Sequence, residues 1–280
     1  MIHTYLLSKE YRRTLNIALI GAGGTGSQML TGLARMAVAL HSLQLENVHV
    51  TVYDPDTVST ANVGRQLFSL ADVGLPKAYV LVNRINAFFG FAWDAVHAAY
   101  HRDIAPNTSN QIIISCVDSR SARKDIYASI QDQPRYWLDL GNGNHSGQAV
   151  LGNSDYASRR PSERKKYTLL PTVADLFPEI LDDQLPEDDA PSCSLAEALH
   201  KQDLMVNQVV ATHALELLWQ LLRHGEIQNH GFFFNAKAFS MQPIPVDKQV
   251  WDRYLKQAKK ARPRFASQDA PTRNTRLVAA

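Results

Sequence analysis

Residues 15–27, LNIALIGAGGTGS, join a short apolar run to a turn that contains four glycines. Runs of this length, rich in Ile and Leu, are typical of strands buried in a parallel sheet. A helix is expected next, because apolar side chains then recur at helical spacing, at Met29, Leu30, Leu33, Met36, Ala37 and Leu40. The stretch therefore predicts a strand, a tight turn and a helix at the start of an α/β fold.

The glycines of the turn follow the pattern Gly-x-Gly-x-x-Gly in the context that gives this pattern meaning. Gly21 would allow the tight turn, and Gly26 would let the helix pack against the strand. Gly23 and Gly24 would let backbone N–H groups approach a phosphate, which the positive end of the helix also attracts. The same glycines could simply serve a tight strand-to-helix turn.

Strands and helices are expected to alternate along the rest of the chain. Apolar runs predict further strands over residues 48–54, 111–118, 136–141 and 147–152, with one or two closing strands within 231–245. Helical patterns occupy residues 76–89, 122–130 and 204–222. The last of these is strongly apolar, and His213 within it is expected to be a hydrogen-bonded core residue. Alternation of this kind predicts a doubly wound, mostly parallel, Rossmann-like sheet with helices on both faces.

Composition excludes several other classes. The chain has 280 residues, 45% hydrophobic and 20% charged, which is ordinary for a soluble globular protein, and its net charge of +2 does not favour nucleic acid as a partner. No apolar run reaches the roughly 18 residues that a membrane span needs. Cys116 and Cys193 are the two cysteines, so neither a disulfide framework nor a structural zinc held by Cys-x-x-Cys pairs is expected. A reducing cytoplasm is the natural setting.

Two segments depart from the α/β pattern. Residues 153–192 combine a basic stretch with an acidic, proline-rich one, and we expect a long crossover loop on the surface, of the kind that often serves as a lid. Residues 246–280 are basic and should form a helix followed by a frayed tail. One α/β domain would then occupy residues 1–245.

Polar residues gather after the second expected strand, in DPDTVSTANVGRQ (residues 54–66). Asp54 closes that strand, where a dinucleotide-binding fold holds a ribose, although an Asp before a proline can also form a turn. Asp56 either caps the segment that follows or belongs to the site. The next polar side chains are Asn62, Arg65, Gln66 and, in VGLPKA, Lys77. They make sense if a triphosphate is attacked at its α-phosphorus, because donors fixed beside the leaving pyrophosphate stabilise the transition state. Each could instead be solvated.

Asp118 ends a central strand, at the edge where open α/β sheets bind ligands. A carboxylate beside polyphosphate is a natural ligand of Mg²⁺, although Asp118 could also cap the helix that follows. Cys116, inside the same apolar strand, is expected to be a core residue.

Together the motifs resemble those of the ThiF/MoeB family, the adenylating domain shared with ubiquitin-activating enzymes. The resemblance rests, in this order, on GAGGTGS (residues 21–27), DPDTVSTANVGRQ (54–66), DVGLPKA (72–78) and CVDSRSAR (116–123). It covers residues 15–152 closely and 193–222 loosely. Within the family, DLGNGNHSGQ (139–148) and QDLMVNQVVATHALELL (202–218) are similar to the ThiF-like members of plasmid-borne PRTRC cassettes.

The resemblance implies binding of ATP with Mg²⁺ and adenylation of a C-terminal carboxylate, usually that of a ubiquitin-like or sulfur-carrier protein. It gives Asp54 the ribose and Asp118 the magnesium ion, and it gives Arg123 a supporting role. The phosphates would be held by Asn62, Arg65, Gln66 and Lys77. The family often donates an N-terminal arginine across a homodimer interface, and Arg12 and Arg13 stand at the right distance before the first strand.

Some features differ from the family pattern or leave alternatives open. The two Cys-x-x-Cys pairs common in the family are absent, and Val63 replaces the usual Leu. Cys193 lies where thiol-bearing members place a cysteine, so it is either a thioester-forming nucleophile or a bystander. The alternatives to an adenylating enzyme are an inactive nucleotide-binding scaffold and an NAD- or FAD-dependent oxidoreductase.

Overall fold

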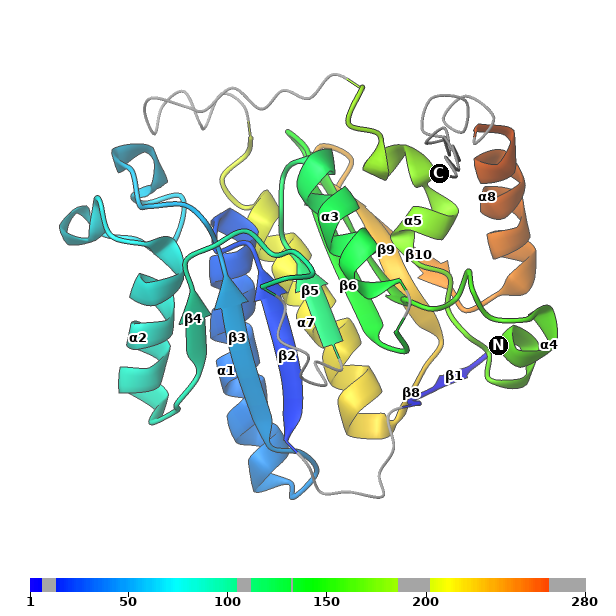
Figure 1. Ribbon diagram of the computed structural model, residues 1–280, viewed down its shortest axis with the longest axis horizontal. Coiled ribbons are helices and arrows are strands. Elements are labelled where there is room, and N and C mark those ends of the chain that lie inside the picture. Colours follow the sequence, from blue (N-terminus) through cyan, green and yellow to red (C-terminus); the bar gives the residue numbers. More distant parts are fainter. Residues whose placement is uncertain (7–13, 105–111, 132, 186–201, 262–280) are drawn as a thin grey trace, which may run out of the picture.

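The computed structural model describes residues 1–6, 14–104, 112–131, 133–185 and 202–261. Its centre is an eight-stranded sheet in the order β10-β9-β7-β6-β5-β2-β3-β4 (Figure 1). Five neighbouring strands are parallel: β2 (Leu15–Ile20), β3 (Val48–Tyr53), β4 (Asp94–Val96), β5 (Ile112–Ser115) and β6 (Tyr136–Asn142). The other three are antiparallel to their neighbours: β7 (Ser146–Asn153), β9 (Asn229–Asn235) and β10 (Ser240–Pro245). The predicted mostly parallel α/β fold is confirmed.

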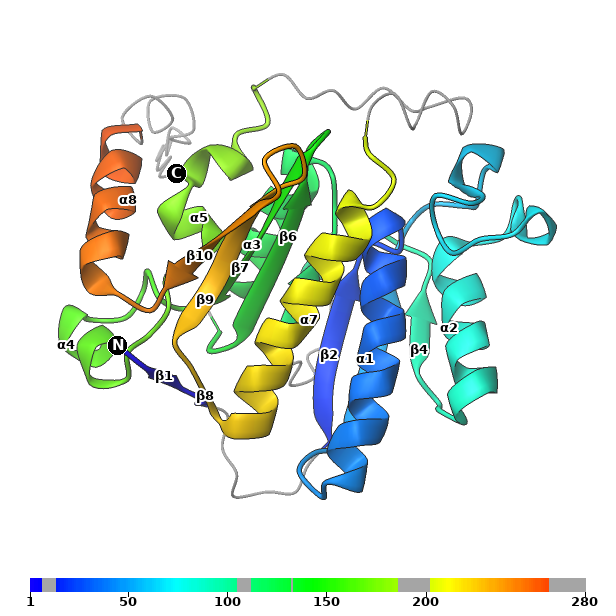
Figure 2. The same ribbon diagram turned by 180° about the vertical axis from the view of Figure 1, so that it is seen from behind.

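Helices cover both faces of this sheet. On one face α1 (Gly24–Ser42) packs against α7 (Val206–His224), with α2 (Lys77–Phe89) next to α1 (Figure 2). The pair is tight because Gly32 lacks a side chain: a Cβ there would lie 2.0 Å from Leu215 Cδ1. The expected apolar stripe of α1 is buried, whereas His213 on α7 is exposed and bonds to Val209 O, contrary to the expectation of a core position.

On the opposite face, α3 (Arg120–Ile130) connects β5 to β6, and a compact segment fills the rest. This segment contains α4 (Pro161–Lys166), α5 (Val173–Leu176) and the 3₁₀ turn η3 (Pro178–Leu181). Several of its apolar residues are buried, among them Leu170, Val173 and Leu176. The expectation of a surface loop over 153–192 is therefore wrong for residues 153–181. Helices this short show no full hydrophobic period in a sequence, although Thr172 and Asp175 form a capping box.

The last described helix, α8 (Lys248–Ala261), matches the expected basic helix and is anchored on this segment. Trp251 is buried, and its indole Nε1 donates to His230 Nε2 at 2.9 Å. His230 Nδ1 in turn meets Leu151 O at 2.8 Å. Burial lowers the pKa of His230 to about 4, so the imidazole stays neutral and can accept the indole hydrogen.

The sequence pattern does not predict the shortest strands. β1 (His3–Thr4) pairs with β8 (Glu226–Ile227), and β4 closes one side of the main sheet. His3 is fully buried and bonds to the hydroxyl of Tyr136 at 2.8 Å. Strands of two or three residues carry no detectable alternation. Within the described residues, no helix has the length and apolar character of a membrane span.

Candidate nucleotide site

The carboxyl ends of the parallel strands meet along the upper edge of the sheet in Figure 2, where α1 begins. From β2 the chain moves outward to β3 and β4, and it then returns to the other side of β2 as β5. This reversal is the topological switch point, beside which doubly wound sheets bind their ligands. The structure brings the glycine turn, Asp54 and Asp118 to this edge.

The glycine turn is shaped by contacts that exclude side chains. Gly21 has φ +90°, and a Cβ there would lie 2.7 Å from Cys116 O. At Gly26 a Cβ would lie 1.8 Å from Gly21 O, so the turn and the helix touch directly. Gly23 is open, with Gln66 Nε2 the nearest atom to such a Cβ at 3.9 Å. The first turn of α1 holds no acidic residue, which leaves its positive end available to an anion.

Asp54 is buried and hydrogen-bonded both to the glycine turn and to its own loop after β3. Its Oδ2 accepts from Ala22 N at 2.5 Å, and its Oδ1 accepts from Asp56 N at 2.8 Å. Burial raises the pKa of Asp54, while these backbone donors and Lys77 oppose the shift. Asp54 thus ties the glycine turn to the chain that follows β3; its contact with a ribose stays a prediction.

Residues 55–76 form an arm that leaves the sheet and returns to it. Its stem closes where Val58 N donates to Leu75 O at 2.9 Å and Lys77 N donates to Asp56 O at 3.0 Å. Two 3₁₀ turns, η1 (Thr60–Asn62) and η2 (Leu70–Asp72), each carry a serine cap. Asn62 accepts from Ser59 N at 2.9 Å, so this side chain, expected at the phosphates, has a structural partner in the arm itself.

Arg65 and Gln66 present polar atoms that the described protein does not satisfy. Gln66 is buried and Arg65 is half-buried, yet Arg65 Nε and Gln66 Oε1 have no hydrogen-bond partner among the described residues. Burial lowers the pKa of the Arg65 guanidinium, and the negative charge of Asp118 opposes that shift. Buried polar atoms without partners are rare in folded proteins and often await a ligand.

Lys77 is a second cation at this edge. It is the first residue of α2, and its side chain is buried except for about a tenth of its surface. Its Nζ donates to Asp56 Oδ2 at 2.8 Å. A buried lysine at the start of a helix is unfavourable for the helix dipole, which argues that the charge serves another purpose.

Arg123 is buried and holds the loop that carries Asp118. Its Nε donates to Asp139 Oδ1 at 3.1 Å, and its Nη2 donates to Val117 O at 2.7 Å and to Leu140 O at 3.2 Å. Asp139 also accepts from Ser115 Oγ at 2.6 Å. The geometry suits the supporting role that the resemblance implies. Asp139 escaped sequence analysis, since a lone Asp in an apolar strand gives no signal of its partner.

A cluster of neutral side chains at the start of α1 was also missed. It joins Thr25 on α1, Asn142 at the end of β6, and Asn207 in the first turn of α7. Gln202 extends the cluster toward Gly143. Asn142 and Asn207 lie within quoted motifs, but nothing local in the sequence shows that they meet.

The described residues offer one candidate ligand for a metal ion, Asp118. In the described residues no group of three or more His, Cys, Asp or Glu side chains could hold a metal ion. Asp118 alone fits a Mg²⁺ that takes its remaining ligands from phosphate and water, as this ion usually does. Cys193, Arg12 and Arg13 lie outside the described residues.

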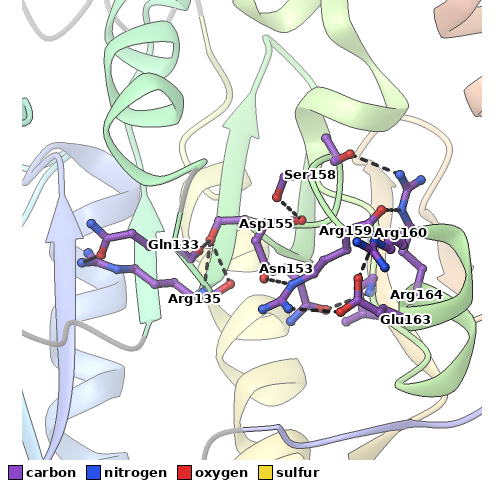
Figure 3. Close-up of polar contacts among 12 residues, drawn as sticks. Gln133, Arg135, Asn153, Asp155, Ser158, Arg159, Arg160, Glu163 and Arg164 are labelled. Carbon is purple, nitrogen blue, oxygen red and sulfur yellow. Dashed lines mark hydrogen bonds and ion pairs between the residues drawn. The ribbon is translucent and has the colours of Figure 1, made fainter.

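A separate polar cluster lies at the opposite edge of the sheet, where β6 begins (Figure 3). It borders a cavity of about 290 Å³ near Arg135 and Tyr136. Within this cluster Arg159 is paired with two carboxylates: its Nε meets Asp155 Oδ2 at 2.6 Å, and its Nη1 meets Glu163 Oε1 at 3.6 Å. Because it lies where β6 begins, this cavity is distinct from the edge that carries the glycine turn.

A glycine turn that opens a helix at the switch point, beside the unsatisfied Nε of Arg65, is the arrangement of a doubly wound α/β protein with a candidate phosphate site. The chain belongs to the ThiF family, whose profile matches residues 8–253.

Curated relatives are ubiquitin-like modifier-activating enzymes and adenylyltransferases. The mouse ubiquitin-like modifier-activating enzyme 6 is 28% identical over 149 residues, which are 50% of this chain and 14% of the relative. The Nedd8-activating enzyme E1 catalytic subunit of Drosophila melanogaster is 31% identical over 126 residues, 44% of this chain and 26% of the relative. The adenylyltransferase and sulfurtransferase UBA4 of Yarrowia lipolytica is 25% identical over 114 residues, 40% and 26% of the two chains. The chain thus spans a minor part of each.

Solved structures share the fold over a larger part of the chain. PaaA superposes with a TM-score of 0.56 at 12% identity, covering 84% of this chain and 64% of its own. The E. coli protein MccB, crystallised with MccA-N7isoASN, gives a TM-score of 0.55 at 13% identity and the same coverage. At such identities the likeness concerns the fold.

Proposed function

We propose that this protein uses MgATP to adenylate the C-terminal carboxylate of a small ubiquitin-like or sulfur-carrier-type protein. One observation carries the proposal: Arg65 Nε and Gln66 Oε1, two buried polar atoms without partners in the described residues, belong to side chains beside the start of α1, where Gln66 Nε2 would lie 3.9 Å from a Cβ on Gly23. Membership of the ThiF family and the activating-enzyme relatives support it.

In the proposed reaction a carboxylate oxygen of the partner attacks the α-phosphorus of ATP. The bond from that phosphorus to the oxygen bridging to the β-phosphate breaks, and pyrophosphate leaves with the electron pair. The products are an acyl-adenylate and pyrophosphate. Arg65 and Lys77 would stabilise the charge that builds on the leaving group, and the backbone N–H groups of the glycine turn would hold phosphate oxygens. Bound Mg²⁺, with Asp118 as a ligand, would neutralise part of the same charge.

Lys77 has to exchange partners for this role. Its ammonium group meets an oxygen of Asp56, whose side chain is 62% exposed. Because Asp56 can be solvated without moving far, ATP phosphates can replace it at little cost. Asp56 then acts as a counter-ion of the free enzyme, which fits its expected place in the site.

The proposal extends to the setting of the reaction. A homodimer would let Arg12 or Arg13 reach the partner subunit's nucleotide. Cys193 would accept the acyl group from the adenylate as a thioester, with release of AMP. The cysteine content agrees with a reducing cytoplasm.

Pyrophosphate–ATP exchange tests the adenylation. The carrier is first captured from extracts of the host with MgATP and identified by mass spectrometry of its C-terminus. Purified protein plus this carrier should then exchange labelled pyrophosphate into ATP, and the exchange should vanish in Asp118→Ala. Asp103→Ala, at a residue whose side chain is 94% exposed, is the matched control and should exchange normally.

Each other outcome has a defined meaning. Undiminished exchange in Asp118→Ala removes Asp118 from the mechanism. Calorimetric ATP binding without exchange for any carrier supports an inactive scaffold, and tight NAD binding that needs no Mg²⁺ supports an oxidoreductase.

A further inference from the structure

Asn207 lies at the centre of the neutral cluster beside the glycine turn. It is buried, and its Oδ1 accepts from Thr25 Oγ1 at 3.1 Å and from Asn142 Nδ2 at 2.9 Å. Its Nδ2 donates to Gln202 Oε1 at 2.9 Å, and Gln202 Nε2 donates to Gly143 O at 3.1 Å. The donors run in one direction, from Asn142 to Asn207, from Asn207 to Gln202 and from Gln202 to Gly143 O.

The same amide touches the backbone where α1 begins. A Cβ on Gly24 would lie 2.4 Å from Asn207 Nδ2 and 3.0 Å from its Cγ. Gly24 therefore lets the Asn207 amide pack against the first residue of the helix, while Thr25 bonds to it from the next position. Three elements far apart in sequence thus meet at one helical turn, and this turn is placed by their contacts.

The cluster holds a neutral amide at a position where a charged carboxylate would also fit. A carboxylate at position 207 could accept from Thr25 and Asn142 as the amide does, and the positive end of α1 would stabilise it. The structure holds an uncharged amide there, and the first turn of α1 is free of acidic residues. A negative charge at this point would compete with a polyphosphate for the same helix end.

We propose that Asn207 is a positioning residue for the polyphosphate of ATP, which fixes the first turn of α1 and keeps that turn itself free of negative charge. The inference rests on the proposed nucleotide site, but it concerns binding and needs no adenylation step. Asn142 and Thr25 assist by holding the amide in one orientation.

Binding measurements on three single variants test this role. Asn207→Ala removes the amide, Asn207→Asp keeps its shape and acceptors but adds charge, and Gln208→Ala removes an exposed amide one residue further along α7. Affinities for MgATP and for adenosine are measured by calorimetry, and thermal melting follows the fold. Asn207→Ala should weaken MgATP about fivefold, because the first turn of α1 loses the amide that positions it. Asn207→Asp should weaken it on the order of a hundredfold through repulsion.

The order of the variants separates positioning from plain stability. A purely structural role predicts that Asp, which keeps more contacts, binds MgATP better than Ala. The proposal predicts the reverse order for MgATP, with adenosine affinity unchanged and Gln208→Ala like the wild type. MgATP binding by Asn207→Asp equal to or better than by Asn207→Ala overturns it.

Two further results complete the test. If neither Asn207 variant folds, Asn142→Asp places the charge on a half-buried member of the cluster and should also weaken MgATP; unchanged affinity there overturns the proposal. Wild-type protein that binds MgATP without exchange defeats the proposed adenylation and leaves the Asn207 comparison decisive. Wild-type protein that does not bind MgATP defeats both.

Discussion

Two ion pairs near the same edge of the sheet differ in their burial and in the number of groups that the cation holds. Arg123 and Asp139 are 6% and 0% exposed, 3.1 Å apart, and the guanidinium also holds the carbonyls of Val117 and Leu140. Lys77 and Asp56 are 10% and 62% exposed, and one ammonium meets one carboxylate oxygen at 2.8 Å. Arg123 joins two strands and a loop, whereas Lys77 faces a partner that water can replace.

The difference separates a cation that builds the site from one that can serve a ligand. A charge enclosed with its partner cannot be withdrawn without leaving the other charge buried and unpaired. A charge whose partner is exposed can change partners cheaply. Substitution of the two cations by methionine, which is apolar and of similar length, gives a matched comparison.

Arg123→Met should give the largest effect, a loss of about 3–5 kcal/mol in the free energy of unfolding, because Asp139 is left unpaired in the interior. Urea unfolding followed by circular dichroism measures it. The double variant Arg123→Met/Asp139→Leu should recover much of this loss, since an apolar pair replaces both charges. Unaltered stability in the single variant would show that the buried pair does not support the fold.

Lys77→Met should leave the fold nearly as stable as the wild type but reduce pyrophosphate–ATP exchange about 10²- to 10³-fold, the usual cost of one lost transition-state donor. Exchange at saturating carrier and the urea midpoint are measured on one preparation. A drop in stability comparable to that of Arg123→Met, with exchange intact, would reverse the comparison.

Asp56→Asn should have the smallest effect. The loss in unfolding free energy should stay below about 1 kcal/mol, as for other solvent-exposed pairs. MgATP affinity should be unchanged or slightly higher, because Lys77 is then free to meet the phosphates. Calorimetry checks this, and strongly weakened binding would mean that Asp56 itself contacts the nucleotide complex.

Much of the fold could be predicted because buried parallel strands are continuous apolar runs and α1 shows a full helical period. β1, β4 and β8 are too short for any period. The sequence pattern failed for residues 153–181 because their packing relies on contacts with distant elements: the ring of Phe177 lies 5.7 Å from that of Phe233 and 5.0 Å from that of Tyr254, centroid to centroid. His213 shows the converse, an exposed position on a helix whose other residues are largely apolar.

The candidate site could be predicted only in part. Motif spacing brought Arg65, Gln66, Lys77 and Asp118 into view, and the structure places all four at one end of the sheet or in the arm beside it. Thr25 and Asn207 are hydrogen-bonded across 182 residues of sequence, and Arg123 and Asp139 across 16. No local pattern encodes such pairs, because the fold creates them. Asn62 shows that a motif residue can have a partner within its own turn.

The capped turns of the arm have a consequence for how a ligand is received. Ser59 with Asn62, and Ser69 with Asp72, close the two turns by short-range bonds, and Arg84 braces the second by donating to Asp72 Oδ2 and to Leu67 O just before it. Arg65 and Gln66 therefore stand on a frame that is rigid before any encounter. The arm loses its conformational entropy when the protein folds, and not when nucleotide binds. Nucleotide binding should therefore need little backbone rearrangement and show a small change in heat capacity.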